Sequence, residues 1–297
     1  MFIMISIPFN PMMFEIGPFA MSWHGFWSFI GILVAVILVA RWAKKDGINT
    51  DIVYDVAMWG ILGGIIGARL MHVFDSADYY FDNPTKIFAI WQGGIGFLGS
   101  MIGGILFGGV YAKLKGYPVG KIADYAAPAM AIAHIIGRIG DIWNGEHHSI
   151  PTDLPWGWVF THPGSPGRLG AERYFGDPNI AVHPAVVYEM IWNALTVLFL
   201  FKSRGKFKPD GSLWVIYMFM YSIGRFFIQF LRIDDVKFTV GGLGIQEGHI
   251  VTFILFLITS LIMILYFGDS NTLKTDELSI DTSKPSSGRK RKAQARR

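Results

Sequence analysis

Three arginines of this sequence, Arg69, Arg138 and Arg225, lie within long apolar stretches. A charged side chain at the centre of a bilayer costs at least about 2.5 kcal/mol, so it needs an acidic partner or a water-filled cavity. The planar guanidinium also donates two parallel hydrogen bonds to a phosphate. For a single arginine, a structural ion pair is the simpler interpretation. Three of them together favour a bound anion, and an anionic phospholipid headgroup is the natural ligand.

Other polar side chains near these arginines offer structural and chemical roles. Histidine and glutamate can accept a proton from a reacting thiol or hydroxyl. His147 and His148 are adjacent, so their side chains diverge on regular structure, and no third ligand has metal-binding spacing; we therefore predict no metal site. The chain has no cysteine, which excludes a cysteine nucleophile of its own. The ion pairs that the sequence allows are Arg138 with Asp141 or Glu146, and Arg69 with Asp55 or Glu189.

The elements that must position these residues are predicted from hydropathy. Hydrophobic residues make up 52% of the 297 residues and charged residues only 16%, below the share of about 25% in soluble domains. Apolar segments recur that are long enough to cross a bilayer as helices of about 30 Å. The sequence predicts an all-α integral membrane protein with about seven transmembrane helices. The segments are Met21–Ala40, Ile52–Phe74, Ile87–Ala112, Tyr125–Trp143, Ala185–Phe201, Ser212–Leu231 and His249–Phe267.

The distribution of basic residues predicts the orientation of these segments. Most of the 26 lysines and arginines follow the first, third and fifth segments or lie in the C-terminal tail. By the positive-inside rule these parts face the cytoplasm, and the N-terminus lies outside. Residues 144–184, rich in Gly and Pro, form a small exterior cap on a membrane domain of residues 1–267. Residues 268–297 are a basic tail, which we expect to be disordered and to anchor at the membrane rather than bind nucleic acid.

This orientation collects the polar residues in one leaflet. Arg69, Arg138 and Arg225 each lie five or six residues before the outer end of their segment, about 8 Å below the boundary. Segments that run in the opposite direction place further polar residues at that level. The set comprises His24, Gln92, Glu189 and His249, beside Asp141, Asn144, Glu146, His147 and His148. The sequence therefore predicts one outward-facing site.

The third segment is rich in glycine, with small residues four positions apart between Gly93 and Gly109. Such spacing lets neighbouring helix backbones approach closely, and we favour this packing interpretation. In the alternative, the run Gln92–Gly99 breaks the helix and exposes backbone N–H groups to an anion.

The run Gly137-Arg138-Ile139-Gly140-Asp141-Ile142-Trp143-Asn144-Gly145-Glu146 resembles the signature of the bacterial prolipoprotein diacylglyceryl transferases, which is Gly-Arg-x-Gly, a polar residue, then Asn-Gly-Glu. Shorter matches follow in the same order over most of the chain. They are Ile16-Gly17-Pro18, Trp23-His24-Gly25, Gly67-Ala68-Arg69, Gly93-Gly94, Asp124 to Pro128, His183-Pro184, Tyr188-Glu189, Arg225 and Arg232.

The resemblance implies a reaction and a location. A diacylglyceryl group would move from phosphatidylglycerol to the lipobox cysteine of a preprolipoprotein, forming a thioether and releasing glycerol phosphate, without a cofactor. The enzyme would be a multi-pass protein of the bacterial plasma (inner) membrane. Arg138 corresponds to the family's lipid-binding arginine, and Arg225 and Arg232 to its other functional arginines. We assign Glu146, Arg225 and His24 to catalysis, and Arg138, Arg232, Asp141, Asn144, Gln229 and Arg69 to substrate binding.

Four positions depart from the family pattern. Leu98 replaces a histidine proposed as the base, Gln229 a glutamate, Asp141 the signature asparagine and His24 a tyrosine. Leu98 cannot accept a proton, so either no histidine is required or another group, Glu146 or His24, serves as the base. We favour Glu146, assisted by arginines that favour the thiolate. The alternatives are an anionic-solute transporter, which the glycine-interrupted segment would suit, and an inactive lipid-binding relative.

Overall fold

The computed structural model describes residues 4–17, 19–89, 94, 96–145, 148–234 and 236–281. Long helices dominate this part of the chain, as the sequence predicts. Four of them are long and apolar enough to cross a membrane, over Trp23–Lys45, Thr50–Asp75, Ala185–Ser203 and Glu247–Phe267. The long helices are α1 (Trp23–Lys45), α2 (Thr50–Asp75), α4 (Phe97–Leu114), α5 (Val119–Asn144), α7 (Ala185–Ser203), α8 (Ser212–Gln229) and α9 (Glu247–Asp281).

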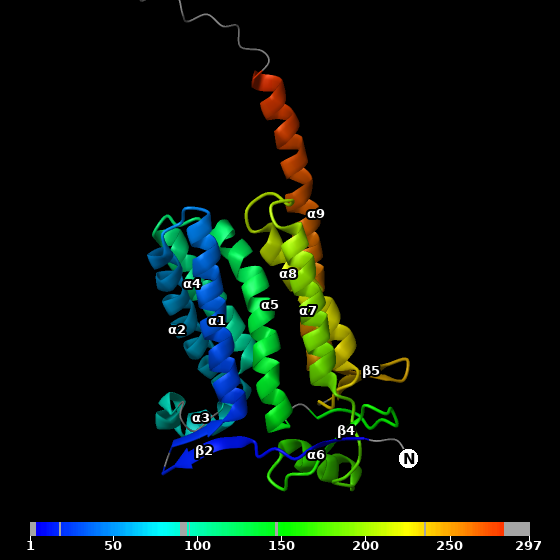
Figure 1. The fold of residues 1–297 in the computed structure, drawn as a ribbon. Coiled ribbons are helices and arrows are strands. Elements are labelled where there is room, and N and C mark those ends of the chain that lie inside the picture. The colour runs from blue at the N-terminus through cyan, green and yellow to red at the C-terminus, as the bar shows by residue number, and fades with distance from the viewer. Residues whose placement is uncertain are drawn as a thin grey trace, which may run out of the picture.

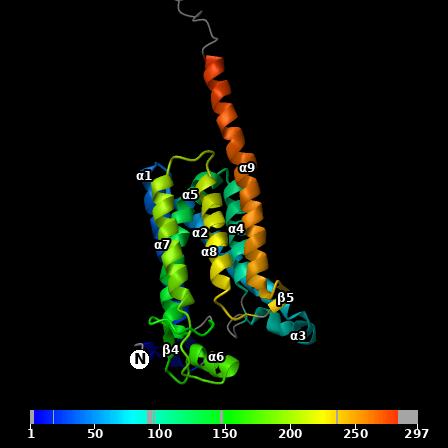
Figure 2. The same ribbon diagram turned by 90° about the vertical axis from the view of Figure 1, so that its right-hand side faces the viewer.

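Helix α5 is central to the packing of the bundle. It contacts α1 on one side and α7 and α8 on the other, while α2 packs on α4 and α8 packs on α9. Figures 1 and 2 show the long helices running side by side along one direction, with α9 extending beyond the rest. Alanines fill the crowded middle of α5, because Ala127, Ala129 and Ala131 have no exposed surface. Helices from both halves of the chain therefore meet on α5.

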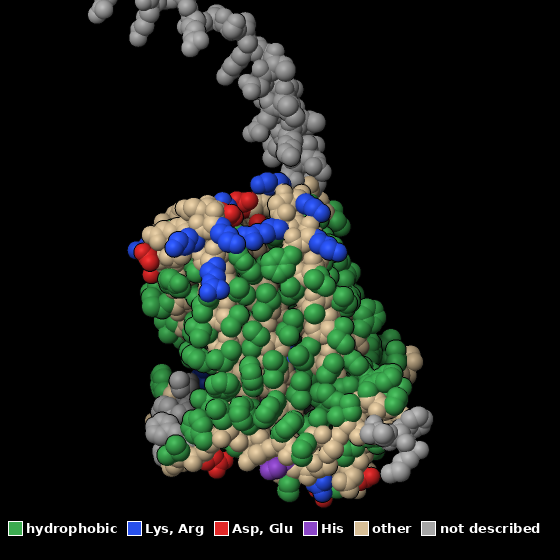
Figure 3. All heavy atoms as spheres, in the orientation of Figure 1, with side chains coloured by type: hydrophobic (Ala, Val, Ile, Leu, Met, Phe, Trp, Pro, Cys, Tyr) green, Lys and Arg blue, Asp and Glu red, His purple; other side chains and the backbone are tan. Residues whose placement is uncertain are grey.

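The outer surface of the bundle is apolar. Figure 3 shows a broad hydrophobic band on one face, and lysines and arginines gathered at one end of it. Large side chains such as Phe29, Leu198 and Ile264 keep 62%, 58% and 71% of their surface exposed. Contiguous apolar surface on this scale is not stable in water and marks a membrane or interaction surface. The fold is that of a helical membrane protein.

Glycines bring α2 and α4 into backbone contact. A Cβ atom added at Gly67, Gly99 or Gly103 would lie closer than 3.0 Å to a main-chain carbonyl oxygen of the facing helix. The close approach expected of the third apolar segment is thus confirmed. Helix α4 nevertheless begins at Phe97 and not at Ile87, because Gly94 has a positive φ of 76° and Gly96, at the N-cap, is extended.

A short 3-10 helix, η1 (Pro84–Phe88), occupies the predicted start of that segment, preceded by α3 (Ala77–Asp82). The part of the glycine run at residues 90–93, which includes Gln92, lies outside the described residues.

Short strands at one end of the bundle were not predicted. β1 (Ile5–Ile7) pairs in parallel with β4 (Trp158–Phe160), which ties the N-terminal segment to the predicted cap. The cap also contains α6 (Pro166–Phe175) and lies at the end opposite to the α7–α8 loop (Figure 1). The other strands form antiparallel pairs, β2 (Met12–Ile16) with β3 (Phe19–Ser22) and β5 (Val236–Val240) with β6 (Leu243–Gln246).

The last helix is longer than the apolar segment that predicted it. The backbone of α9 continues past Phe267 to Asp281, into the tail that we expected to be disordered. Residues 282–297, which hold the basic cluster of that tail, lie outside the described residues.

Candidate active site

Glu189 joins three arginines from different parts of the chain. It lies in the second turn of α7 and is 6% exposed. One carboxylate oxygen accepts a hydrogen bond from Arg225 Nη1 at 2.5 Å, and the other faces Arg138 Nη2 at 2.6 Å. Arg232 Nη1 lies 3.7 Å from the carboxylate. Helices α5, α7 and α8 are therefore joined at one buried carboxylate.

Asp141 forms a second acidic contact on the same cluster. Its Oδ2 accepts a hydrogen bond from Arg138 Nη1 at 2.5 Å, and its Oδ1 lies 2.5 Å from His24 Nδ1. Asp141 is only 2% exposed. The spacing of three residues on α5 brings Arg138 and Asp141 onto one helix face. The sequence predicts that Arg138 pairs with Asp141 or Glu146, and the pair with Asp141 is confirmed.

The charges of this cluster are balanced. Arg138, Arg225 and Arg232 carry three positive charges within the described residues, and Glu189, Asp141 and Asp234, which lies 3.7 Å from Arg232 Nε, carry three negative charges. Arg138 and Arg225 keep 21% and 17% of their side chains exposed, so their guanidinium groups remain accessible beside the carboxylates. The geometry therefore suits an anionic headgroup.

Gln229 acts behind this cluster rather than in it. The side chain is fully buried, and its amide donates to Asp234 Oδ2 at 2.6 Å and to Gln246. The Gln246 amide donates in turn to the carbonyl oxygen of Arg232 at 2.9 Å. This chain of hydrogen bonds holds the turn after α8, so Gln229 orients Arg232.

Arg69 lies in a different environment. Its guanidinium donates to the carbonyl oxygens of Lys86, Ile87 and Gly94 at 2.6, 2.8 and 2.9 Å, and it stacks 5.2 Å from the Tyr80 ring centroid. The residue is 6% exposed. These contacts fasten the segment between α2 and α4, which favours an anchoring role over the headgroup role assigned from the sequence.

We expect Arg69→Lys to lower the melting temperature of the detergent-solubilised protein and to leave its affinity for phosphatidylglycerol nearly unchanged. A lysine cannot serve three carbonyls at once, and each buried carbonyl left without a partner costs about 1–3 kcal/mol. Thermal unfolding and lipid binding measured on the same preparation check this. A loss of lipid affinity at an unchanged melting temperature would restore the headgroup role.

The remaining predicted site residues follow α5. Asn144 is buried at the end of the helix, and Gly145 closes it in a left-handed conformation with a φ of 69°, which explains an Asn-Gly pair here. Glu146 and His147 lie outside the described residues. The two catalytic candidates that the structure describes, His24 and Arg225, contact opposite carboxylates of the cluster, Asp141 and Glu189.

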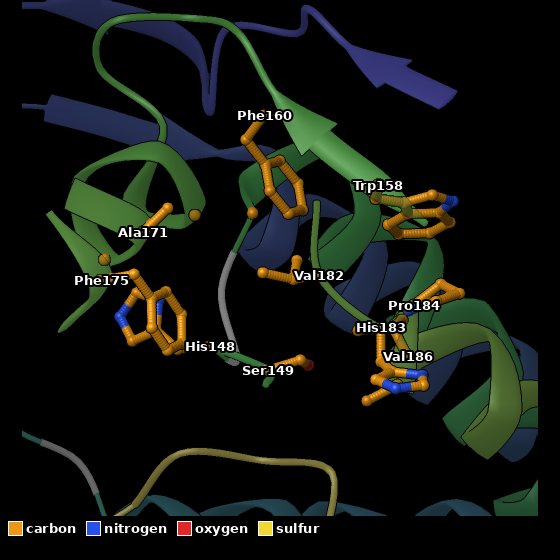
Figure 4. Close-up of a pocket in the computed structure, with 14 residues that line it drawn as sticks. His148, Ser149, Trp158, Phe160, Ala171, Phe175, Val182, His183, Pro184 and Val186 are labelled. Atoms are coloured by element: carbon orange, nitrogen blue, oxygen red, sulfur yellow. The ribbon is translucent and has the colours of Figure 1, made fainter. Parts of the chain in front are cut away.

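A small cavity lies in the cap, next to this turn. His148, Ser149, Phe160, Val182 and His183 are among its lining residues (Figure 4). Its volume of about 20 Å³ holds roughly one water molecule. Burial lowers the pKa of His183 below its ordinary value of 6.5. The cavity is too small for a lipid headgroup.

Known proteins resemble this chain over most of its length. The family model of the prolipoprotein diacylglyceryl transferases matches residues 11–266. The chain belongs to this family. Similar relatives are the phosphatidylglycerol–prolipoprotein diacylglyceryl transferases of Trichormus variabilis, 36% identical over 76% of this chain and 80% of the relative, and of Lysinibacillus sphaericus, 32% identical over 84% and 90%. That of Bifidobacterium adolescentis is 32% identical over 89% of this chain and 81% of the relative.

Membership of the diacylglyceryl transferase family confirms the resemblance that the signature run indicated. It places Arg138, Asp141 and Glu189, which meet in space, inside the matched region. The sequence analysis considered Glu189 as a partner of Arg69 and did not assign it to catalysis or substrate binding, whereas the structure brings it into contact with Arg138, Arg225 and Arg232. An acidic residue in an apolar helix, at the depth of the arginines, was the available signal.

Proposed function

We propose that this chain transfers the diacylglyceryl group of phosphatidylglycerol to the cysteine thiol of prolipoproteins in a multi-pass membrane setting. Its relatives carry the name of this activity, and the chain is a transferase by family. The observation that carries the proposal is the cluster of Arg138, Arg225 and Arg232 around Glu189. The family match favours transfer over an anionic-solute transporter or an inactive lipid-binding relative.

The arginines act on the leaving group in this reaction. A thiolate attacks the glyceryl carbon, the bond between that carbon and the phosphate oxygen breaks, and glycerol phosphate leaves with one more negative charge than the phosphodiester had. Arg138 and Arg225 already lie where they can bind two phosphate oxygens. Positive charge fixed in a site of low dielectric stabilises the developing charge at little reorganisation cost.

An apolar groove beside the cluster suits an acyl chain of the same lipid. It lies between α7 and α8, has a volume of about 270 Å³ and is lined by Tyr188, Ile191, Trp192, Leu195, Gly224, Phe227 and Ile228. Tyr188 and Gly224 are the chain neighbours of Glu189 and Arg225. A headgroup on the arginines would therefore place its hydrocarbon at the opening of this groove.

Reconstitution of the full chain in liposomes tests the proposal. Phosphatidylglycerol labelled in its acyl chains and a peptide with a lipobox cysteine are supplied, and transfer of the label to the peptide is followed. A thioether-linked product that requires the cysteine supports the proposal. Labelled lipid that binds but never reaches the peptide contradicts it.

The orientation of the bundle, about seven spans with the cap and active site outside, belongs to the same proposal. We expect Asp177→Cys, in the exposed part of the cap, to react with a membrane-impermeant maleimide in intact cells. Lys206→Cys, in the α7–α8 loop, should react only after permeabilisation, because the basic loops face the cytoplasm. The absence of other cysteines makes each labelling specific. The reverse labelling pattern would reject this orientation.

A further inference from the structure

We propose that His24 and Asp141 form a proton-accepting pair, in which His24 takes the proton of the substrate thiol and Asp141 positions it. The inference rests on the proposed transfer reaction and names the group that starts it. It is carried by the contact of His24 Nδ1 with Asp141 Oδ1 at 2.5 Å.

The contact fixes which ring nitrogen can accept a proton. A carboxylate accepts hydrogen bonds, so Asp141 holds the tautomer with hydrogen on Nδ1 and the lone pair on Nε2. Asp141 is 2% exposed, whereas the His24 side chain keeps 42% of its surface exposed. The orienting carboxylate is therefore buried, and the ring that it orients can be reached by a thiol.

Asp141 also connects this ring to the phosphate-binding arginines. Its two oxygens are divided between His24 and Arg138, and Arg138 in turn contacts Glu189. The proposed proton acceptor, His24, and the proposed phosphate-binding residue, Arg138, thus contact the same carboxylate. This arrangement suits a reaction in which a thiol loses its proton next to the carbon–oxygen bond that breaks.

The backbone places the pair. Ser22 Oγ accepts a hydrogen bond from the Gly25 amide at 3.1 Å and caps α1, so His24 lies in the first helical turn. At the same level α5 has Gly140, where an added Cβ atom would lie 2.7 Å from the His24 Cα atom. Only glycine allows α1 and α5 to approach this closely, and the approach brings His24 within hydrogen-bonding distance of Asp141.

The proposed step is balanced. The thiol S–H bond breaks and its proton moves to His24 Nε2, giving an imidazolium beside the Asp141 carboxylate. The thiolate forms the S–C bond to the glyceryl carbon, and the electron pair of the broken C–O bond leaves on glycerol phosphate. The imidazolium then returns its proton to solvent or to the departing phosphate.

Chemical rescue tests the role of His24. In the reconstituted full chain, we expect His24→Ala to lower the transfer rate at least about a hundredfold, within the range for loss of a general base, while phosphatidylglycerol binding persists. Added imidazole should restore part of the rate, because it can occupy the space of the ring and accept the proton. Pyrazole has a similar shape but is a much weaker base, so it should restore little.

Three further variants complete the test. Asp141→Asn should also slow transfer, but without rescue by imidazole, because it removes the positioning group and leaves the ring in place. Gly140→Ala should slow transfer by separating α1 from α5, whereas Gly137→Ala, one turn earlier, should not, since its added Cβ meets only Ser28 Oγ at 3.9 Å.

The inference is overturned if His24→Ala transfers at the wild-type rate, or if imidazole fails to restore a folded, lipid-binding variant. A large loss in Glu146→Gln with an unchanged His24→Ala would assign the base to Glu146, as the sequence favoured. A wild-type chain without any transfer activity would instead reject the proposed function itself. The two failures are therefore distinguishable.

Discussion

Replacing Arg138 with alanine is expected to lower diacylglyceryl transfer by at least about 10²–10³-fold, the range for removing one preorganised donor to a developing anion. Arg138 contacts both Asp141 and Glu189, so its loss removes the phosphate contact and leaves two carboxylates facing the space meant for an anion. The rate of label transfer from phosphatidylglycerol to a lipobox peptide measures the effect.

Arg138→Lys should recover little of this activity. An ammonium group keeps the charge but cannot bind two oxygens in parallel or contact both carboxylates with one planar group. Arg204→Ala is the matched control, because Arg204 lies at the opposite end of the bundle beside Trp42 and Tyr125. A well-folded Arg138→Ala protein with near-normal turnover would remove Arg138 from the site.

The second large effect concerns Glu189, which is buried between Arg138 and Arg225. We expect Glu189→Gln to destabilise the protein by up to about 3–5 kcal/mol, the cost of breaking a buried ion pair by removing one partner. Transfer should also fall by at least about a hundredfold, because the guanidinium groups lose the carboxylate that aligns them. Thermal unfolding and transfer rates, measured on one preparation, separate the two effects.

A double variant sharpens this prediction. Glu189→Gln combined with Arg225→Gln removes one charge of each sign, so it should recover part of the lost stability. It should not recover transfer, because one phosphate-binding arginine is then missing. If the double variant is as active as the wild type, neither residue belongs to the active site. If the single variant is both stable and active, Glu189 is not the organising carboxylate.

The sequence predicted the long helices and the end of the bundle at which the buried polar residues gather. Hydropathy located the helices because lipid-facing side chains must be apolar along their whole length. The ion pair of Arg138 with Asp141 was also predictable, since residues three apart on one helix are neighbours. The signature run supplied the family, which the comparison confirms.

Contacts between distant parts of the chain were harder to predict from the sequence. Arg69 has the same predicted depth as Arg138, but it donates to three carbonyl oxygens of the segment before α4. Every residue has a backbone carbonyl, so the sequence does not indicate which carbonyls an arginine will bind. Glu189 had been considered as a partner of Arg69, whereas it contacts Arg138 and Arg225. Helix rotation decides between such partners, and hydropathy does not determine rotation for helices packed on several sides.

The contact between Glu189 and Arg225 also constrains how the chain is made. The two residues lie on α7 and α8, consecutive helices separated only by residues 204–211. If each helix were inserted alone, it would carry an unpaired charge into the hydrocarbon. The free-energy cost for the arginine is about 2.5 kcal/mol or more. If the two helices leave the translocon together as a hairpin, the ion pair neutralises both charges before they enter the lipid. The ion pair therefore favours insertion of α7 and α8 as one hairpin over insertion of each helix alone.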